Sequence, residues 1–200
     1  MRYLTGDYPG AIQDLDEALG IYRSHDDQLG QANSLNFLGY VRQLAGDYPA
    51  AARAQEEALA ICRDQGNRLG QANALLYLGA MRRLTGNYPA AAQALEETLG
   101  IYRSMGDPGG EAEALNEFGA LHQARGDLDQ AVAFHQRALD LAREIDATWD
   151  EAHALAGLGR CALAANRIAD GQASLRQARE IFQRIGAAEA HDIAAEIGWS

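Results

Sequence analysis

The sequence predicts an all-α fold, a solenoid in which antiparallel helix pairs stack one on the next, with about ten helices in all. The first observation is a repeat of 40 residues, in which Gly6-Asp7-Tyr8-Pro9 returns as Gly46-Asp47-Tyr48-Pro49 and as Gly86-Asn87-Tyr88-Pro89. Weaker copies follow at Gly126-Asp127-Leu128 and Asn166-Arg167-Ile168. The second observation is that apolar residues recur at helical spacing inside each period, and no run alternates between polar and apolar residues. Such a repeat indicates units that bury their apolar faces only against their neighbours.

Two helices are expected in each period, and the second period shows why. A first helix covers residues 31–45, because apolar side chains recur there at three-residue steps: Ala32, Leu35, Leu38, Val41 and Leu44. Gly46 is expected to end this helix. Asp47 is expected to be the N-cap of a second helix that runs to about Asp64, and Pro49 is tolerated in its first turn.

The turns between periods carry signals of their own. Gly66, Gly106 and Gly186 stand where a left-handed C-terminal cap is expected. Asn67 and Asp107 are then expected to cap the helices that follow. Applied along the chain, these signals predict helices of roughly 12 to 18 residues.

A column of glycines lies in the middle of the first helices, at Gly39, Gly79, Gly119 and Gly159. Glycine inside a helix costs about 1 kcal/mol relative to alanine, so its recurrence calls for a packing reason. We expect the second helix of each pair to cross at this glycine. A second column, Ala51, Ala91 and Ala131, is expected to supply the small surface that faces it.

The spacing of these columns resembles the tetratricopeptide repeat family. Leu38-Gly39 with Ala51 and Ala58 matches the family signature, and the later periods repeat the match: Leu78-Gly79 with Ala91, and Phe118-Gly119 with Ala131 and Ala138. The resemblance covers nearly the whole chain. It implies a right-handed superhelical α-solenoid whose first helices line a concave face.

The chain departs from the family pattern at three points. The usual tryptophan is leucine at Leu35, Leu75, Leu115 and Leu155, and the usual closing proline is arginine at Arg63, Arg103 and Arg143. The period is also longer than the usual 34 residues. Repeats of about 40 residues are similar to those of kinesin light chains and LGN-type scaffolds, and to the C-terminal arrays of actinobacterial regulators.

The repeat predicts a single array over residues 1–200, divided into a partial unit at 1–26, full units at 27–66, 67–106, 107–146 and 147–186, and a terminal segment at 187–200. The first residues align with the tail of a first helix, so the array is expected either to be a fragment of a longer one or to cover its open end by self-association. Residues 187–200 form either a further partial unit or a polar C-terminal cap.

Composition narrows the classes of partner. The net charge of −11 and the pI near 4.8 argue against nucleic acid or an anionic membrane surface. No segment is long and apolar enough to span a membrane and no apolar leader is present, so we expect a cytoplasmic location. All 17 basic residues are arginine, which is typical of the coding bias of a GC-rich bacterial genome.

The family resemblance implies that a ligand lies on the concave face of the first helices. The residues expected there are Asn33, Asn36, Tyr40, Gln43, Asn73, Tyr77, Arg83, Glu113, Asn116, Gln123, His153 and Arg160. An asparagine amide both donates to and accepts from a peptide backbone. The alternative is that these amides bond to neighbouring turns or to water. The carboxylate clamp of chaperone-binding repeats needs two lysines, and this chain has none.

Residues with a capacity for chemistry are isolated in this sequence. Cys62 and Cys161 fall in columns of core residues, and the five histidines show no metal-ligand spacing. No phosphate-binding loop occurs. We therefore expect no catalytic residue, no cofactor and no metal.

These observations favour a non-enzymatic interaction module. Its concave groove is expected to bind a peptide or protein segment, extended or helical, as the sensor or scaffold part of a larger bacterial regulatory protein. The alternative is an arm that self-associates through open solenoid ends and controls the oligomerisation of attached domains.

Overall fold

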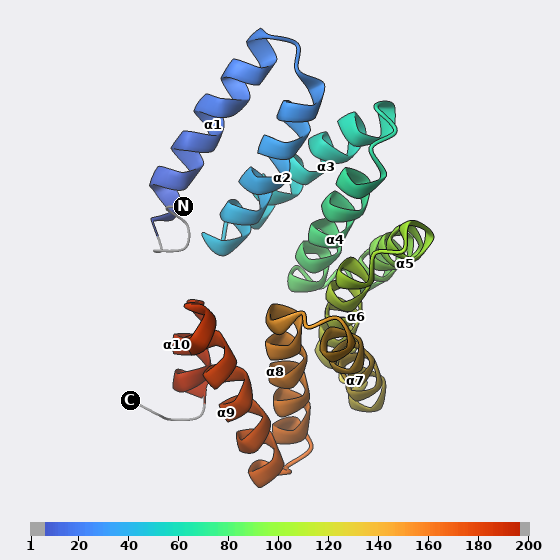
Figure 1. Cartoon of the computed structure of the whole chain (residues 1–200), viewed down its shortest axis with the longest axis vertical. Coiled ribbons are helices and arrows are strands. Elements are labelled where there is room, and N and C mark those ends of the chain that lie inside the picture. Colours follow the sequence, from blue (N-terminus) through green and yellow to red (C-terminus); the bar gives the residue numbers. More distant parts are fainter. Residues whose placement is uncertain (1–6, 197–200) are drawn as a thin grey trace. The chain divides into compact units, whose positions relative to one another are not determined.

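The computed structural model describes residues 7–196, and these residues form ten α helices and no strand. The helices, drawn in Figure 1, are α1 (Tyr8–Ser24), α2 (Gln28–Leu44), α3 (Tyr48–Asp64), α4 (Arg68–Leu84), α5 (Tyr88–Met105), α6 (Pro108–Ala124), α7 (Leu128–Glu144), α8 (Thr148–Ala164), α9 (Ile168–Ile185) and α10 (Glu189–Glu196). Within each unit, neighbouring helices are joined by short turns and pack against each other. The predicted all-α fold is confirmed.

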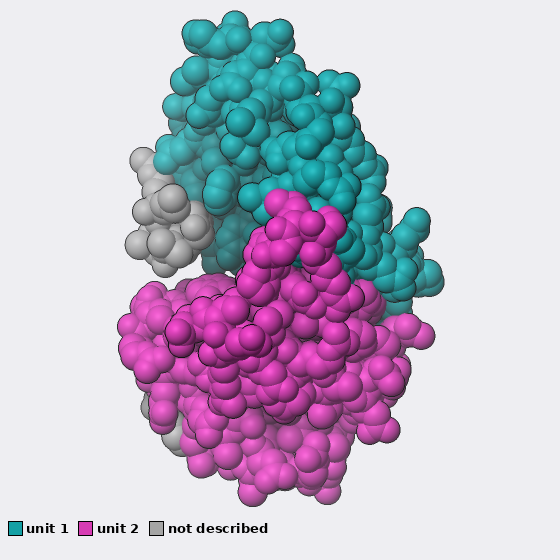
Figure 2. Space-filling view, turned by 45° about the vertical axis from the view of Figure 1, so that its right-hand side comes forward, with its two compact units in different colours: residues 1–102 teal, residues 103–200 magenta. Residues whose placement is uncertain are grey.

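The chain divides into two compact units, residues 1–102 and residues 103–200, which Figure 2 colours separately. Unit 1 contains α1 to α4 and most of α5. Unit 2 contains α6 to α10 after the last residues of α5. In each unit, even-numbered helices are the first members of repeats and odd-numbered helices are the second.

The helix starts follow the capping pattern expected from the sequence. The side chains of Asp47, Asn67 and Asp107 each accept a hydrogen bond from the backbone N–H three residues further on, at 3.1, 2.9 and 3.1 Å. These three N-caps are confirmed. Asp127 differs, because its carboxylate lies 3.1 Å from Nδ1 of His122, and α7 has no side-chain cap bond.

The turns share one backbone conformation at intervals of 20 residues. Positive φ angles occur at Gly46, Gly66, Gly86, Gly106, Gly126 and Gly186, and in the same register at Asp26, Asp146 and Asn166. The left-handed caps expected at residues 66, 106 and 186 are confirmed. The turn inside each repeat uses the same conformation as the turn between repeats, which the sequence analysis did not predict.

The glycine column marks the crossing of the two helices, as expected. An added Cβ at Gly79 would lie 2.8 Å from Cδ2 of Leu95, and one at Gly159 would lie 3.0 Å from the backbone oxygen of Gly171. The nearest atoms belong mainly to a column one helical turn after the expected alanines: Gln55, Leu95, His135 and Leu175. Ala91 contributes only a backbone oxygen at 3.6 Å from the position of the added Cβ.

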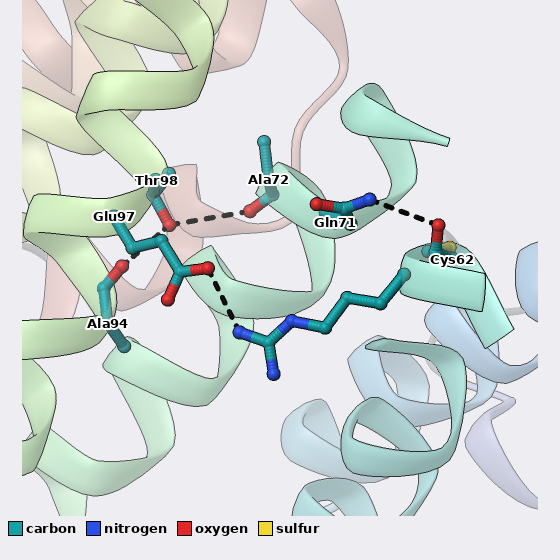
Figure 3. A network of polar contacts seen from close by, with 7 residues as sticks. Cys62, Gln71, Ala72, Ala94, Glu97 and Thr98 are labelled. Carbon is teal, nitrogen blue, oxygen red and sulfur yellow. Dashed lines mark hydrogen bonds and ion pairs between the residues drawn. The ribbon is translucent and has the colours of Figure 1, made fainter. Parts of the chain in front are cut away.

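Polar bonds join consecutive helices of unit 1, as Figure 3 shows. The Gln71 side chain donates to the backbone oxygen of Cys62 at 3.0 Å. The Thr98 hydroxyl donates to its own helix at Ala94 and lies 3.5 Å from the backbone oxygen of Ala72. At the surface, Arg63 and Glu97 form an ion pair at 2.9 Å, which links the second helices of neighbouring repeats.

The arginines that replace the family's proline form ion pairs with carboxylates. Arg103 pairs with Glu111 at 2.8 Å, and Arg143 pairs with Glu151 at the same distance. Both carboxylates lie on the helix that follows the arginine. Arg103 has no acceptor on the next second helix, because Arg137 stands where glutamate stands in the earlier repeat.

We predict that the two kinds of helical glycine respond oppositely to alanine. Gly159→Ala should lower the free energy of unfolding by about 1–3 kcal/mol, because the new methyl group displaces the backbone at Gly171. Gly100→Ala should raise it by about 0.5–1 kcal/mol, because nothing lies within 4 Å of the new Cβ and alanine favours the helix. Urea unfolding of both variants measures this. A stabilised Gly159→Ala variant would contradict the crossing constraint.

Candidate functional site

A shallow pocket of about 80 Å³ opens between the first helices α2 and α4 of unit 1, which Figure 1 shows side by side. It is lined by five residues expected on the concave face and one that was not: Asn33, Asn36, Tyr40, Asn73 and Tyr77, with Phe37. None of these side chains carries a charge. The structure therefore brings two consecutive repeats together around a neutral, partly aromatic pocket.

The aromatic walls are held by contacts within unit 1. The rings of Tyr40 and Tyr77 lie 5.5 Å apart between centroids, inclined by 42°. Phe37 is 51% exposed, although it is a large apolar side chain. Asn73 accepts a hydrogen bond from the Tyr102 hydroxyl at 2.7 Å, which fixes the orientation of its amide. The pocket thus presents apolar surface that is largely organised before any ligand arrives.

Asn36 is the deepest residue of the pocket, with 8% of its surface exposed. Its backbone oxygen accepts from the Gln55 side chain at 2.9 Å. Its side-chain oxygen is shielded from water and has no hydrogen-bond donor within the described chain. A buried acceptor without a donor costs about 1–3 kcal/mol.

Two further candidates of unit 1 lie outside the pocket. Gln43 is half-buried two helical turns beyond Asn36 on α2, and its side-chain oxygen is also shielded without a donor in residues 7–196. Arg83 is half-buried near the end of α4. The stripe Asn33, Asn36, Tyr40 and Gln43 thus follows one face of α2, as the resemblance implied.

Asn116 of unit 2 occupies the same repeat position as Asn36, but its amide is engaged inside the unit. Its nitrogen donates to the backbone oxygen of Asp150 at 3.1 Å, and its oxygen lies 3.2 Å from Nδ1 of the buried His135. This amide ties α6 to α7 and to the start of α8. That arrangement is the alternative which the sequence analysis left open for the asparagines.

An acidic pair lies on the first helices of unit 2. Burial, together with the nearby carboxylates of Asp150 and Glu117, raises the pKa of Glu113 to about 7. Burial likewise raises the pKa of Asp150 to about 6, although a hydrogen bond from its own backbone lowers it in part. Both carboxyl groups therefore take up protons near neutral pH.

The remaining candidates of unit 2 have partners in the fold. His153 packs against Trp149 and Phe182 with ring centroids 5.1 Å away, and burial and Arg160 lower its pKa to about 4. Arg160 forms a two-pronged ion pair with Glu196 of α10, at 2.7 and 3.0 Å. Gln123 is half-buried on α6.

Two residues that shape these faces were not singled out from the sequence. Phe37 shares its repeat position with Tyr77, so the 40-residue register held the signal. Asp150 breaks a glycine column that includes Gly30 and Gly70. At Gly70 an added Cβ would collide with the sulfur of Cys62. Two repeats later the smaller Ala142 stands at the position of Cys62, opposite Asp150.

Both cysteines lie in the core as expected. Cys62 is 1% exposed and Cys161 is fully buried, and burial raises the pKa of both thiols. Within residues 7–196, no three or more His, Cys, Asp or Glu side chains are arranged to hold a metal ion. No helix of that range is long and apolar enough to cross a membrane.

Comparison with known proteins identifies the same repeat in sequence and in structure. The sequence profile of the tetratricopeptide repeat matches residues 1–64, 32–104 and 110–184. No curated protein matches the chain. The crystal structure of BtubC (BKLC) from P. vanneervenii is 21% identical with a TM-score of 0.70, over 92% of this chain and 76% of that one.

A second solved structure has the same repeat. It is a putative kinesin light chain with nearly identical TPR-like repeats from Podosopora anserina, 18% identical with a TM-score of 0.64, over 92% of both chains. At identities this low, the structural similarity shows that the folds are alike and nothing more.

We predict that Glu113→Gln stabilises the protein only at neutral and higher pH. The folded pKa of about 7 lies above the ordinary value of 4.5, so the free energy of unfolding falls as pH rises through this window. Glutamine stays neutral, so the variant should gain on the order of 2 kcal/mol at pH 8 and little at pH 4.5. Thermal unfolding at both pH values measures this, with the exposed Glu56→Gln as control. Equal stability of the variant and the wild type at pH 8 would contradict the raised pKa.

Proposed function

The chain belongs to the tetratricopeptide repeat family, and from this premise we propose that it is a non-enzymatic module whose unit 1 groove binds a peptide or protein segment. Proteins of this family are generally scaffolds for protein–protein interaction. The expected kinesin-light-chain-like variety of the repeat is confirmed by the structural neighbours.

The pocket between α2 and α4 carries this proposal. Its six lining residues combine aromatic surface with three amides, and one of these amides holds a buried oxygen with no donor in the described part of the chain. Apolar walls with a few fixed polar groups are typical of binding sites. Because the Asn73 amide and the two tyrosine rings are already held in place, little side-chain entropy is lost on binding.

We further propose that the chain is one array of five repeat units and serves as the sensor or scaffold part of a larger bacterial regulator in the cytoplasm. Its two cysteines are buried thiols, as in proteins of a reducing compartment. The arginine-only composition supports a bacterial source. The exposed carboxylates of the second helices, which include Glu56 and Glu96, face water.

Selection of random dodecapeptides displayed on phage tests the groove. Peptides enriched on the wild-type chain should bind at least tenfold more weakly to the Asn33→Ala/Phe37→Ala variant. Both side chains are exposed, so their loss should not change the fold. The control is Ile168→Ala, because Ile168 is 50% exposed, as Phe37 is 51%, and lies on α9 of unit 2. Equal binding to all three proteins would refute the groove.

A second candidate function is self-association through α1. Tyr22 is 36% exposed and its neighbour Ile21 is 60% exposed, whereas Cys62 and Tyr102, at the repeat position of Tyr22, are 1% exposed. The exposed apolar surface of Ile21 and Tyr22 fits a second copy of the chain.

Light scattering distinguishes this candidate from the first. If α1 mediates self-association, the mass of the wild-type chain should rise with concentration, and Ile21→Arg should keep the chain monomeric. A constant mass for the wild type would reject self-association and would leave the groove proposal intact.

A further inference from the structure

A second pocket of unit 1, the α3–α4 pocket, lies between the second helix of one repeat and the first helix of the next. Its volume is about 180 Å³. Its apolar lining comes from the start of α3 and the last turns of α4: Tyr48, Pro49, Ala52, Leu78 and Met81. It shares no residue with the groove pocket, and its α4 residues follow a different helical stripe from Asn73 and Tyr77. The α3–α4 pocket is therefore a separate feature of unit 1.

Two charged residues line the α3–α4 pocket, and only one of them has a partner. The Arg82 guanidinium donates to the backbone oxygen of Ala90 at 3.3 Å. Glu56 is exposed, and its carboxylate forms no ion pair or hydrogen bond with any of residues 7–196. The net charge of −11 also attracts cations to this chain and repels anions. The pocket therefore favours a ligand that brings a cation to Glu56.

The preceding repeat shows which substitutions open this pocket. Ile12 of α1 stands at the repeat position of Ala52 and is the larger side chain. Asp16 of α1 and Arg42 of α2 stand at the positions of the two charged residues, and they form an ion pair at 3.6 Å. Between α3 and α4, an alanine thus replaces a bulky side chain, and the carboxylate is left unpaired.

The volume of the α3–α4 pocket suits an aromatic ring. An apolar cavity of about 150 Å³ in a protein is large enough to bind benzene. Leu78 and Met81 are both 2% exposed, so they form a fixed apolar wall. A ring that enters the pocket removes apolar surface from water, and the methionine sulfur adds a favourable contact with it.

We propose that the α3–α4 pocket binds a protein partner through an aromatic side chain and the basic side chain next to it. The ring packs against Leu78 and Met81, and the cation pairs with Glu56. An arginine suits this position best, because its planar guanidinium can donate two parallel hydrogen bonds to one carboxylate. This second interaction surface is independent of the groove between α2 and α4.

Capped dipeptides test the two halves of this recognition. The probe is N-acetyl-phenylalanyl-arginine amide, titrated into the isotope-labelled full chain and followed by NMR. Three analogues each change one side chain: alanine replaces phenylalanine, or citrulline or glutamate replaces arginine. Citrulline keeps the shape of arginine and lacks its charge. We expect the amide signals of residues 48–56 and 78–85 to shift with the phenylalanyl-arginine probe.

The affinities of the analogues should follow the chemistry of the pocket. The phenylalanyl-arginine probe should bind at least about tenfold more tightly than the alanyl-arginine probe, because only the former fills the pocket. It should bind roughly threefold to fivefold more tightly than the citrulline analogue, which is the range of an exposed ion pair. The glutamate analogue should bind most weakly of the three phenylalanyl probes.

Two variants and one control connect these affinities to the pocket. Ala52→Ile should abolish binding, because the larger side chain takes up the space, and Ile12 shows that this repeat column accommodates isoleucine. Glu56→Gln should bind the arginine and citrulline probes equally, and it keeps the fold because Glu56 is exposed. Glu180→Gln removes an exposed charge from α9 of unit 2 and should leave every affinity unchanged.

Four results would overturn the proposal. They are an absence of shifts at the pocket, an Ala52→Ile variant that is folded and still binds, an alanyl or citrulline probe that binds as tightly as phenylalanyl-arginine, and a glutamate probe that binds more tightly. The groove variant Asn33→Ala/Phe37→Ala should bind the probe as the wild type does. A loss of binding in that variant would place the probe in the groove and would also overturn the proposal.

Discussion

The close crossing of the two helices at a central glycine is the constraint on which each repeat depends. At Gly39, Gly79, Gly119 and Gly159 a side chain would meet the facing helix at contact distance or closer. The crossing brings the second helix against the first, so that the alanine columns are fully buried, as at Ala51 and Ala91. The helix-weakening glycine is tolerated because this burial offsets its cost.

The residue that fills the crossing also decides what the groove asparagines can do. Where this residue is His135, its ring lies against the side-chain oxygen of Asn116, and that amide becomes part of the framework of unit 2. Where it is Gln55, the amide donates to the backbone oxygen of Asn36, and the side-chain oxygen of Asn36 has no donor among residues 7–196. Two asparagines in one repeat column thus acquire different roles from a buried neighbour on another helix.

Most of the fold was predictable because its signals are local or periodic. Asp47 and Asn67 cap helices through the backbone three residues on, which sequence spacing alone specifies. Gly66 and Gly106 take positive φ angles for equally local reasons. The exact partner of the crossing glycine was missed, because its position depends on how two helices rotate against each other.

The site was less predictable, because the fate of a groove side chain depends on neighbours far away in sequence. Arg160 is engaged by Glu196, and the pKa of Glu113 is raised by burial and then by Asp150, which lies where other repeats have glycine. The first concave position reads Asn33, Asn73, Glu113 and His153 in successive repeats, and none of these side chains is fully buried. Since such residues contribute little to the core, they vary while the glycine and alanine columns persist. The residues proposed for recognition and those that stabilise each repeat therefore occupy different columns, and Asn116 is a proposed recognition position that is part of the framework of unit 2.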